Sequence, residues 1–381
     1  MKPTILCVLI LCCVLTGVTS AKSPTYGNWT EITSNASFSP RESPGVTVFD
    51  NRLWVIGGYA PNDLTNEVWS SPDGKNWTLE TEHAEFSPRT YHSVVTFDDK
   101  LWVIGGSSTM GYANDVWSSP NGRNWTLETE HAAFSPRCRH GVAIFDRRLW
   151  VIGGSHIEEG YNVFINDVWS SADGKTWDLE TEHAEFSPRW GTGVVAFDNK
   201  LWVFAGTGNL ISDIWSSADG KNWALVNGNA PFCSCDNNQV TVFGDRIFVV
   251  GTSSPEHGVP NDVWSSADGK NWTVERVQED FGTRVFNKVV VFNNGLWAIA
   301  GFDSLNSARA KNDVWYMPLP IPSQTPITTT PSHTISPTIP PTVEPTVTKT
   351  TTTKAAGTPT VIGVSLCIAS MAGAYCIKRK E

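Results

Sequence analysis

An arginine follows five of six regularly spaced tryptophans at a distance of 12 residues, which makes it the repeated side chain with the clearest chemical potential. These arginines are Arg41, Arg89, Arg137, Arg189 and Arg284, and Cys235 takes the position in the remaining unit. A guanidinium binds a carboxylate or a sulfate through two parallel hydrogen bonds, so a ring of arginines at a channel mouth would suit an anionic ligand. An arginine that repeats with a structural frame can instead hold loop carbonyls or an aspartate, and we favour this framework role.

Trp190 is the one tryptophan of 18 that the repeat pattern described below does not require. It follows Arg189 on a link between units, where an exposed ring can stack on a sugar or anchor a protein contact. A role as a wedge between structural units is equally open. The other aromatic candidates for ligand binding are Tyr59, Tyr112, Tyr161, Phe164 and Phe302.

His92 and His140 each lie three residues after one of the repeated arginines. Two imidazoles from neighbouring units can approach each other, but a metal site needs further ligands. The pair is therefore a weak metal candidate, and we predict no cofactor.

The elements that would position these side chains follow from a repeat of about fifty residues. In each unit a tryptophan lies 24 residues before the apolar residue that opens a short strand: Trp29/Leu53, Trp77/Leu101, Trp125/Leu149, Trp177/Leu201, Trp223/Ile247 and Trp272/Leu296. Within 45–82 we expect strands at 46–49 and 53–56, joined by Asp50-Asn51, and strands through 68–69 and 77–79, joined by a Pro-Asp-Gly turn. Four antiparallel strands that cannot bury their own faces predict one blade of a propeller.

The two ends of the repeat region complement each other. The last unit has no fourth strand after its third strand at 312–315, whereas 27–30 at the N-terminus is a fourth strand without a unit. Pairing them completes six blades and closes the ring. We therefore predict an all-β fold, a six-bladed β-propeller over 27–317 whose N-terminal strand closes the last blade.

The segments 53–58 (LWVIGG) and 66–69 (NEVW), together with Arg89 and His92, resemble kelch repeats. The resemblance covers 27–317 and implies a kelch-type propeller similar to the central domain of galactose oxidase. In the last three units the glycine pair becomes Ala205-Gly206, Gly251-Thr252 and Ala300-Gly301, which weakens the expectation of tight backbone packing there. The segment 71–77 (SPDGKNW) also resembles the Asp-box of sialidase-like propellers, but it lacks one residue between Asp and Gly, and the period favours kelch.

Kelch-like propellers include copper oxidases and sugar isomerases, so the resemblance also implies an enzyme as the alternative class. Copper oxidation of that kind needs a cysteine paired with a tyrosine and two histidines around an open metal position. No spacing in this sequence forces such a cluster, and no pair of acidic residues is marked for glycoside hydrolysis. A non-enzymatic role is therefore favoured.

The segments outside the propeller predict export and anchoring. Residues 1–21 have the charged, apolar and small-residue regions of a signal peptide, and 361–377 is an uncharged stretch just long enough to span a membrane, followed by a basic tail at 378–381. Between them, 318–360 contains 15 Thr and 10 Pro among its 43 residues, a composition that predicts an extended stalk. The expected location is the extracellular face of the cell membrane.

Charge and sequons fit an extracellular chain. The formal net charge of -10 comes without basic runs in the repeats, which excludes a nucleic-acid partner. Sequons at Asn28, Asn35, Asn76, Asn124 and Asn271 are candidate glycosylation sites.

Length variation between units points to one recognition face. The span from second to third strand is 16 residues at Leu53–Trp69, 20 at Leu149–Trp169 and 14 at Leu201–Trp215. Loops that vary on one face of a repeat array often bind the ligand. We expect a surface-displayed binding or adhesion module for an extracellular protein or glycan. The alternative is an extracellular carbohydrate-active enzyme, of oxidase, isomerase or glycosidase type, that uses the same face.

Overall fold

The structure, a computed structural model, describes residues 26–206, 212–232, 239–250, 262–276, 284–303 and 309–320. The chain divides into two units, Met1–Gln324 and Thr325–Glu381, and every described residue lies in the first. The predicted signal peptide, nearly all of the predicted stalk, the anchor, the basic tail, Cys233 and Cys235 lie outside the described residues.

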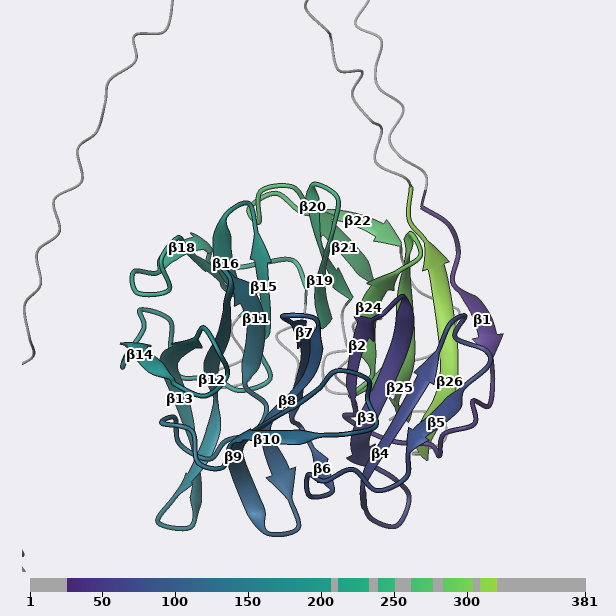
Figure 1. The fold of residues 1–381 in the computed structure, drawn as a ribbon. Helices are drawn as coiled ribbons and strands as arrows, with labels where there is room; N and C mark the ends of the chain where they lie inside the picture. Colours follow the sequence, from purple (N-terminus) through teal and green to yellow (C-terminus); the bar gives the residue numbers. More distant parts are fainter. Residues whose placement is uncertain are drawn as a thin grey trace, which may run out of the picture. The chain divides into compact units, whose positions relative to one another are not determined.

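The described residues form an all-β propeller of six blades, in which each blade is an antiparallel sheet in the order expected from the repeat (Figure 1). Blade 1 is β2 (Gly45–Phe49), β3 (Arg52–Tyr59), β4 (Leu64–Ser71) and β5 (Thr78–Thr81); blade 2 is β6 (Arg89–Thr90), β7 (Ser93–Phe97), β8 (Lys100–Ser108), β9 (Gly111–Ser119) and β10 (Thr126–Thr129); blade 3 is β11 (Gly141–Phe145), β12 (Arg148–Glu158), β13 (Tyr161–Ser171) and β14 (Asp178–Thr181). Within a blade we call the successive main strands a, b, c and d, from the centre outward.

The remaining blades repeat the plan, and the last one joins the two ends of the propeller. Blade 4 is β15 (Gly193–Phe197), β16 (Lys200–Phe204), β17 (Ile214–Ser217) and β18 (Ala224–Asn227); blade 5 is β19 (Gln239–Phe243), β20 (Arg246–Val250), β21 (Val263–Ser266) and β22 (Thr273–Arg276); blade 6 is β23 (Arg284–Val285), β24 (Lys288–Phe292), β25 (Gly295–Asp303), β26 (Arg309–Pro318) and β1 (Thr30–Thr33). Strand β1 pairs antiparallel with β26, with Glu31 opposite Trp315. The predicted closure by the N-terminal strand is therefore confirmed.

The hairpins have the turn chemistry that their residues favour. Asp50 and Asn51 both adopt positive φ, 47° and 53°, as a two-residue hairpin between strands a and b requires. In the turn between strands c and d, the backbone N–H of Gly74 donates to the hydroxyl of Ser71 at 2.8 Å, and that of Asn76 donates to Asp73 at 2.8 Å. Equivalent bonds recur in the other complete blades, so the repeated Ser-x-Asp-Gly motif is explained by the turn alone.

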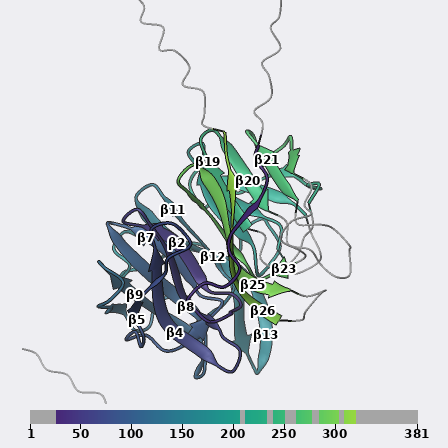
Figure 2. The same ribbon diagram turned by 90° about the vertical axis from the view of Figure 1, so that its right-hand side faces the viewer.

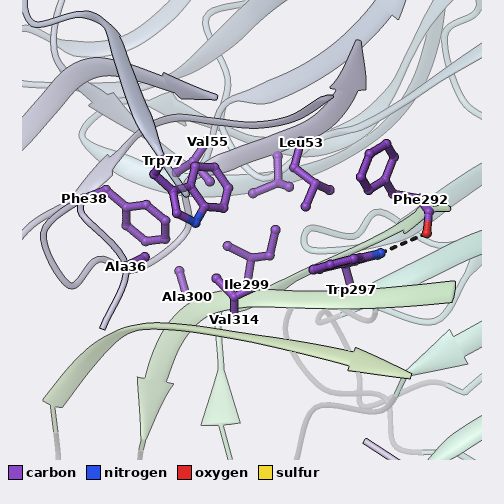
Figure 3. Close-up of a cluster of buried hydrophobic side chains, with 11 residues drawn as sticks. Ala36, Phe38, Leu53, Val55, Trp77, Phe292, Trp297, Ile299, Ala300 and Val314 are labelled. Carbon is purple, nitrogen blue, oxygen red and sulfur yellow. Dashed lines mark hydrogen bonds between the residues drawn. The ribbon is translucent and has the colours of Figure 1, made fainter. Parts of the chain in front are cut away.

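Buried apolar side chains of the described residues gather in six clusters, one between each pair of neighbouring blades. Figure 3 shows the cluster that closes the ring, where Trp297 and Ile299 of blade 6 face Leu53 of blade 1. The indole of Trp297 donates to the carbonyl of Phe292 at 2.8 Å. Its polar atom is thereby satisfied while the ring remains buried.

Each strand-b tryptophan packs against the c–d turn glycine of the next blade. A Cβ built on Gly122 would lie 2.1 Å from the ring of Trp54, and one on Gly74 would lie 2.2 Å from that of Trp297. The same close approach joins Gly174 to Trp102, Gly220 to Trp150 and Gly269 to Trp202. These glycines also have positive φ near 70°, so both the backbone and the neighbouring ring require glycine.

The exception to this pattern has a physical reason. Blade 6 takes its strand d from the N-terminus, so it has no c–d turn and no turn glycine to receive a ring from blade 5. The strand-b position of blade 5 is Phe248, which instead packs edge-on against Tyr26 just before β1, with ring centroids 6.0 Å apart. Phe248 is the one strand-b position of the repeat without tryptophan.

Two details refine the predicted propeller. Ala205 and Ala300 replace the first glycine of the pair, yet they keep its positive φ, 43° and 59°. The tight backbone conformation is therefore retained in blades 4 and 6. Strand β26 continues to Pro318 and Leu319 is buried against blade 6, so the folded part extends beyond 317.

We expect Gly122→Ala to lower the free energy of unfolding by about 3 kcal/mol, because it combines a positive-φ penalty with a clash against Trp54. Gly160→Ala is the matched control, since Gly160 has φ 85° but nothing within 4 Å of a built Cβ, and should cost about 1 kcal/mol. Urea unfolding of both variants measures the difference. Equal losses would show that the contact with the Trp54 ring contributes nothing.

Candidate functional site

The loops joining strands b and c and the links joining blades lie on one face, as predicted. Glu42, on the link into blade 1, pairs with Tyr59 at the end of β3, and Cys138 pairs with Ser155 of β12 in the same way. In blade 2, Arg89 of β6 lies opposite Ser108 of β8. We call this the hairpin face, because the β3–β4, β8–β9 and β12–β13 hairpins project from it (Figure 1).

The chain enters and leaves the propeller on the opposite face. Strand β26 begins at the hairpin face with Arg309 and ends at Pro318, whose carbonyl accepts a hydrogen bond from Gly27 at 3.3 Å. Figure 2 shows the same arrangement from the side, with the ends of the described chain leaving away from the hairpins.

The projecting hairpins of blades 2 and 3 carry exposed apolar side chains. Met110 is 91 % exposed at the tip of β8–β9, and Ile157 and Tyr161 are 51 % and 75 % exposed on β12–β13. Tyr59 of blade 1 is 44 % exposed. Tyr59 and Tyr161 were predicted from the sequence as ligand contacts. Met110 and Ile157 were not, because apolar residues in a strand pattern are normally expected to be buried.

Tyr112, another predicted ligand contact, joins two hairpins instead of projecting freely. Its hydroxyl donates to Asn162 of the neighbouring blade at 2.8 Å. Burial raises the pKa of Tyr112 to about 12, and the adjacent thiol of Cys138 adds to the shift. Cys138 itself is buried and forms no disulfide. Tyr112 therefore remains protonated at neutral pH and fixes the β8–β9 hairpin against β12–β13.

Phe302 lies in a shallow hollow between blades 6 and 1. It is half-buried and lines this hollow with Pro40, Tyr59 and Arg309. The structure therefore brings two of the predicted aromatic residues, Phe302 and Tyr59, to one place on the hairpin face.

Trp190 is half-buried, and its ring contacts two side chains of blade 3. Its ring stacks on Phe164 of β13 at a centroid distance of 5.4 Å, and the guanidinium carbon of Arg139 lies 3.8 Å from its centroid. Its indole N–H is buried without a hydrogen-bond partner among the described residues. Trp190 therefore links blades 3 and 4, and its role in binding a sugar or a protein stays a prediction.

Arg139 is the centre of an aromatic cluster that sequence reasoning missed. Its guanidinium carbon lies 4.0 Å from the centroid of Tyr91 and 5.6 Å from that of Phe286, and these two rings contact each other edge-on at 5.8 Å. With Trp190, these side chains come from blades 2, 3, 4 and 6. We call Tyr91, Arg139, Trp190 and Phe286 the mouth cluster.

A single repeat position supplies most of this cluster. The residue two places after each frame arginine has positive φ: Ser43 (46°), Tyr91 (54°), Arg139 (54°), Gly191 (64°) and Phe286 (60°). Backbone hydrogen bonds run between blades at this level, from Ser43 N to Phe286 O, from Arg139 N to Tyr91 O and from Gly191 N to Arg139 O. Non-glycine residues held at positive φ tend to occur at functional sites. An alignment of the units would have revealed this position, because its residue differs in every described blade.

The frame arginines themselves are occupied within their blades. Arg89 is fully buried, donates twice to Asp115 at 2.6 and 2.8 Å, and also donates to the carbonyls of Ser87 and Gly105 at 3.0 Å. Trp117 donates to the same carboxylate at 2.7 Å. The pairs of this kind are Arg41–Glu67, Arg89–Asp115, Arg137–Asp167 and Arg189–Asp213.

These contacts support the framework role over the anion-binding role for the four described arginines. Burial raises the pKa of Asp115, but the hydrogen bond and the charge of Arg89 outweigh it and leave that pKa below its ordinary value. The guanidiniums have no donors directed to solvent that an external anion could use, because they are buried and bonded internally. Nothing is described of the side chain of Arg284.

We expect Arg89→Leu to lower the free energy of unfolding by about 4 kcal/mol, because it leaves the Asp115 carboxylate partly buried without its cation. Arg148→Leu is the control, since the Arg148–Asp178 pair is solvent-exposed and should be worth less than about 1 kcal/mol. Chemical denaturation compares the two. A loss below about 1 kcal/mol for Arg89→Leu would argue against a framework role.

His92 and His140 are buried between blades, beside the channel. Neither ring makes a hydrogen bond of good geometry among the described residues. Burial, followed by the charges of Arg137 and Lys288, lowers the pKa of His140 to about 3. Burial and then Arg89 lower the pKa of His92 well below its ordinary value. Within the described chain, no group of three or more His, Cys, Asp or Glu side chains could hold a metal ion.

The stability of the propeller should fall as the pH drops from about 6.5 towards 3. An unfolded histidine takes up a proton near pH 6.5, whereas His140 in the folded state stays neutral down to about 3. The unfolded state then binds more protons, and each such histidine costs up to about 1.4 kcal/mol per pH unit in this window. We expect His140→Gln to flatten the dependence, measured by urea unfolding between pH 7 and 4. Parallel curves for the variant and the wild type would contradict this.

The inner strands surround a cavity of about 190 Å³ at the centre of the ring. Strands β2, β7, β11, β15, β19 and β24 contact one another in a closed circle around it (Figure 1). Its polar lining includes Ser43, His92, Arg139, His140 and Lys288. The mouth cluster residues Tyr91 and Arg139 line the same cavity, so the cluster and the cavity are continuous.

The predicted glycosylation sites are all exposed among the described residues: Asn28, Asn35, Asn76, Asn124 and Asn271. The amides of Asn76 and Asn271 donate to the turn aspartates Asp73 and Asp268, at 2.7 and 2.8 Å. The side chain of Asn35 accepts a hydrogen bond from Asn312 at 2.7 Å. The structure thus presents these side chains at the surface, and their modification stays a prediction.

Six four-stranded blades closed by an N-terminal strand, with a glycine pair in strand b and a tryptophan in strand c, define a kelch-repeat β-propeller domain. Residues 24–206 match the family model described as the KLHDC2/KLHL20/DRC7 Kelch-repeats domain. This stretch spans β1 to β16, and the same blade plan continues to β26. No curated protein matches the chain. Kelch propellers typically bind proteins.

In the described ranges, no helix is long and apolar enough to cross a membrane. The predicted anchor at 361–377 lies outside those ranges.

Proposed function

We propose that this chain is a cell-surface binding protein whose hairpin face contacts an extracellular protein. The observation that carries the proposal is the row of exposed apolar side chains on the hairpins of blades 2 and 3, namely Met110, Ile157 and Tyr161. Methionine and tyrosine are enriched at protein interfaces.

The hairpins are also pre-organised for binding. The Tyr112–Asn162 hydrogen bond ties the two hairpins together, and β12 pairs with β13 as far as Glu158 and Tyr161. A rigid apolar surface loses little conformational entropy when a partner binds. Glu158 and Glu159 at the β12–β13 turn place negative charge beside the apolar residues, so a partner with a basic rim fits this surface.

Display at the cell surface is supported by the sequence outside the propeller and by the exit direction of the chain. The signal-like segment, the Thr/Pro-rich segment and the uncharged segment 361–377 follow the order of an anchored surface protein. Strand β26 ends on the face opposite the hairpins, so the described end of the propeller leaves the hairpin face uncovered. Glycans on the five exposed sequons would be compatible with this location.

The test is to express the full chain with an epitope tag inserted after Lys22 and to stain intact cells. We expect surface staining, and staining only after permeabilisation would contradict the proposed location. Soluble candidate ectodomains are then titrated onto the same cells. Met110→Ser/Tyr161→Ser should weaken binding of a partner by about tenfold or more, as loss of interface anchors usually does.

The control is Leu179→Ser/Leu225→Ser, which removes two exposed apolar side chains, 47 % and 53 % exposed, from the outer strands β14 and β18. It should leave binding unchanged. A partner whose affinity falls equally with both double variants would show that the hairpin face is not the binding surface. Binding to protein-free glycan surfaces, also sensitive to Tyr161, would identify a glycan as the ligand instead.

A further inference from the structure

The central cavity contains buried polar atoms that no described protein group satisfies. They are the hydroxyl oxygen of Ser43 and the ring nitrogens of His92 and His140, whose N–H groups are directed to the backbone carbonyls of Ile56 and Ile104 without good hydrogen-bond geometry. Buried polar atoms in folded proteins are almost always hydrogen-bonded, to protein, to water or to a ligand. Three side chains from three different blades, left unsatisfied around one cavity, therefore indicate that the cavity has a polar occupant.

The charge of the lining selects the kind of occupant. Arg139 and Lys288 line the cavity, and no Asp or Glu is among its described lining residues. Lys288 forms no ion pair with a described residue, and its charge acts on both imidazoles. These two positive charges come from blades 3 and 6, so a metal cation would be repelled here and an anion attracted.

The state of Lys288 points in the same direction. It is surrounded by protein but retains some accessible surface, because it faces the cavity. Burial, followed by repulsion from Arg139, lowers the pKa of Lys288 to about 8, so at neutral pH the ammonium is present under an electrostatic penalty. An anion beside the ammonium would relieve that penalty.

We propose that the central cavity of the propeller is a binding site for a small oxyanion, held by the Lys288 ammonium and by the hydroxyl of Ser43. Neutral imidazole has a single N–H donor, and those of His92 and His140 are directed to the carbonyls of Ile56 and Ile104, so the ammonium and the hydroxyl are the donors left for an anion. A cavity of about 190 Å³ has room for a sulfate, a phosphate or a small carboxylate. The site goes beyond the proposed protein-binding function and does not depend on it.

The test is isothermal titration of the purified propeller at pH 7 with sodium sulfate, sodium phosphate and sodium acetate, at ionic strength held constant with sodium chloride. We expect saturable binding of at least one of them. A preference for sulfate or phosphate assigns a tetrahedral oxyanion, and a preference for acetate assigns a carboxylate. Lys288→Met should weaken that binding by about tenfold or more, since a charge-assisted hydrogen bond is lost.

Lys200→Met is the matched control, because this substitution removes the same charge from an exposed lysine at the start of β16. It should bind like the wild type. If Lys288→Met does not fold, Lys288→Gln and Ser43→Ala carry the comparison. Absence of saturable binding by the wild type, or equal affinity in Lys288→Met and Lys200→Met, would overturn the proposal and leave water as the occupant. Met110→Ser/Tyr161→Ser should bind the anion normally, so this test and that of the hairpin face fail independently.

Discussion

The contact between a strand-b indole and the turn glycine of the next blade is the constraint on which the ring depends. It recurs at five of the interfaces between blades, from Trp297 with Gly74 round to Trp202 with Gly269, and it leaves no room for a Cβ. The indole ring must lie at a fixed distance from the next blade, so the tryptophan sets the spacing of the blades. Closure by β1 removes one c–d turn, and at that interface alone Phe248 with Tyr26 replaces the pair.

The frame satisfies its own polar groups, which leaves function to residues outside it. The indoles of strand b donate to a carbonyl of strand a, those of strand c donate to the frame carboxylate, and those of strand d donate to the turn glycine. The arginine completes this network by binding the same carboxylate, as Arg41 does with Glu67. Residues so fully bonded have little capacity for a ligand. Variation is concentrated instead at the hairpin tips and at the position two residues after each arginine.

The two proposed sites differ in their physical basis. The hairpin face offers rigid exposed apolar area, which suits a large partner. The cavity offers an unsatisfied hydroxyl donor and positive charge in a small volume, which suits a small anion. Arg139 stands between them, since it contacts the aromatic rings of the mouth cluster and also lines the cavity. An occupant of the cavity would therefore lie directly beneath the part of the hairpin face that Trp190 and Tyr91 form.

The sequence alone determined the four-strand unit, the six blades and the closure by the N-terminal strand, because period, turn residues and the unmatched ends are local or countable features. It also indicated the variable face and the framework role of Arg89. It did not reveal that Tyr91, Arg139, Trp190 and Phe286 meet, or that Lys288 faces His92 and His140. These residues lie tens to hundreds of positions apart and share no pattern of type. Only the closed ring brings them together, since they belong to blades 2, 3, 4 and 6 and meet at a channel that no single repeat contains.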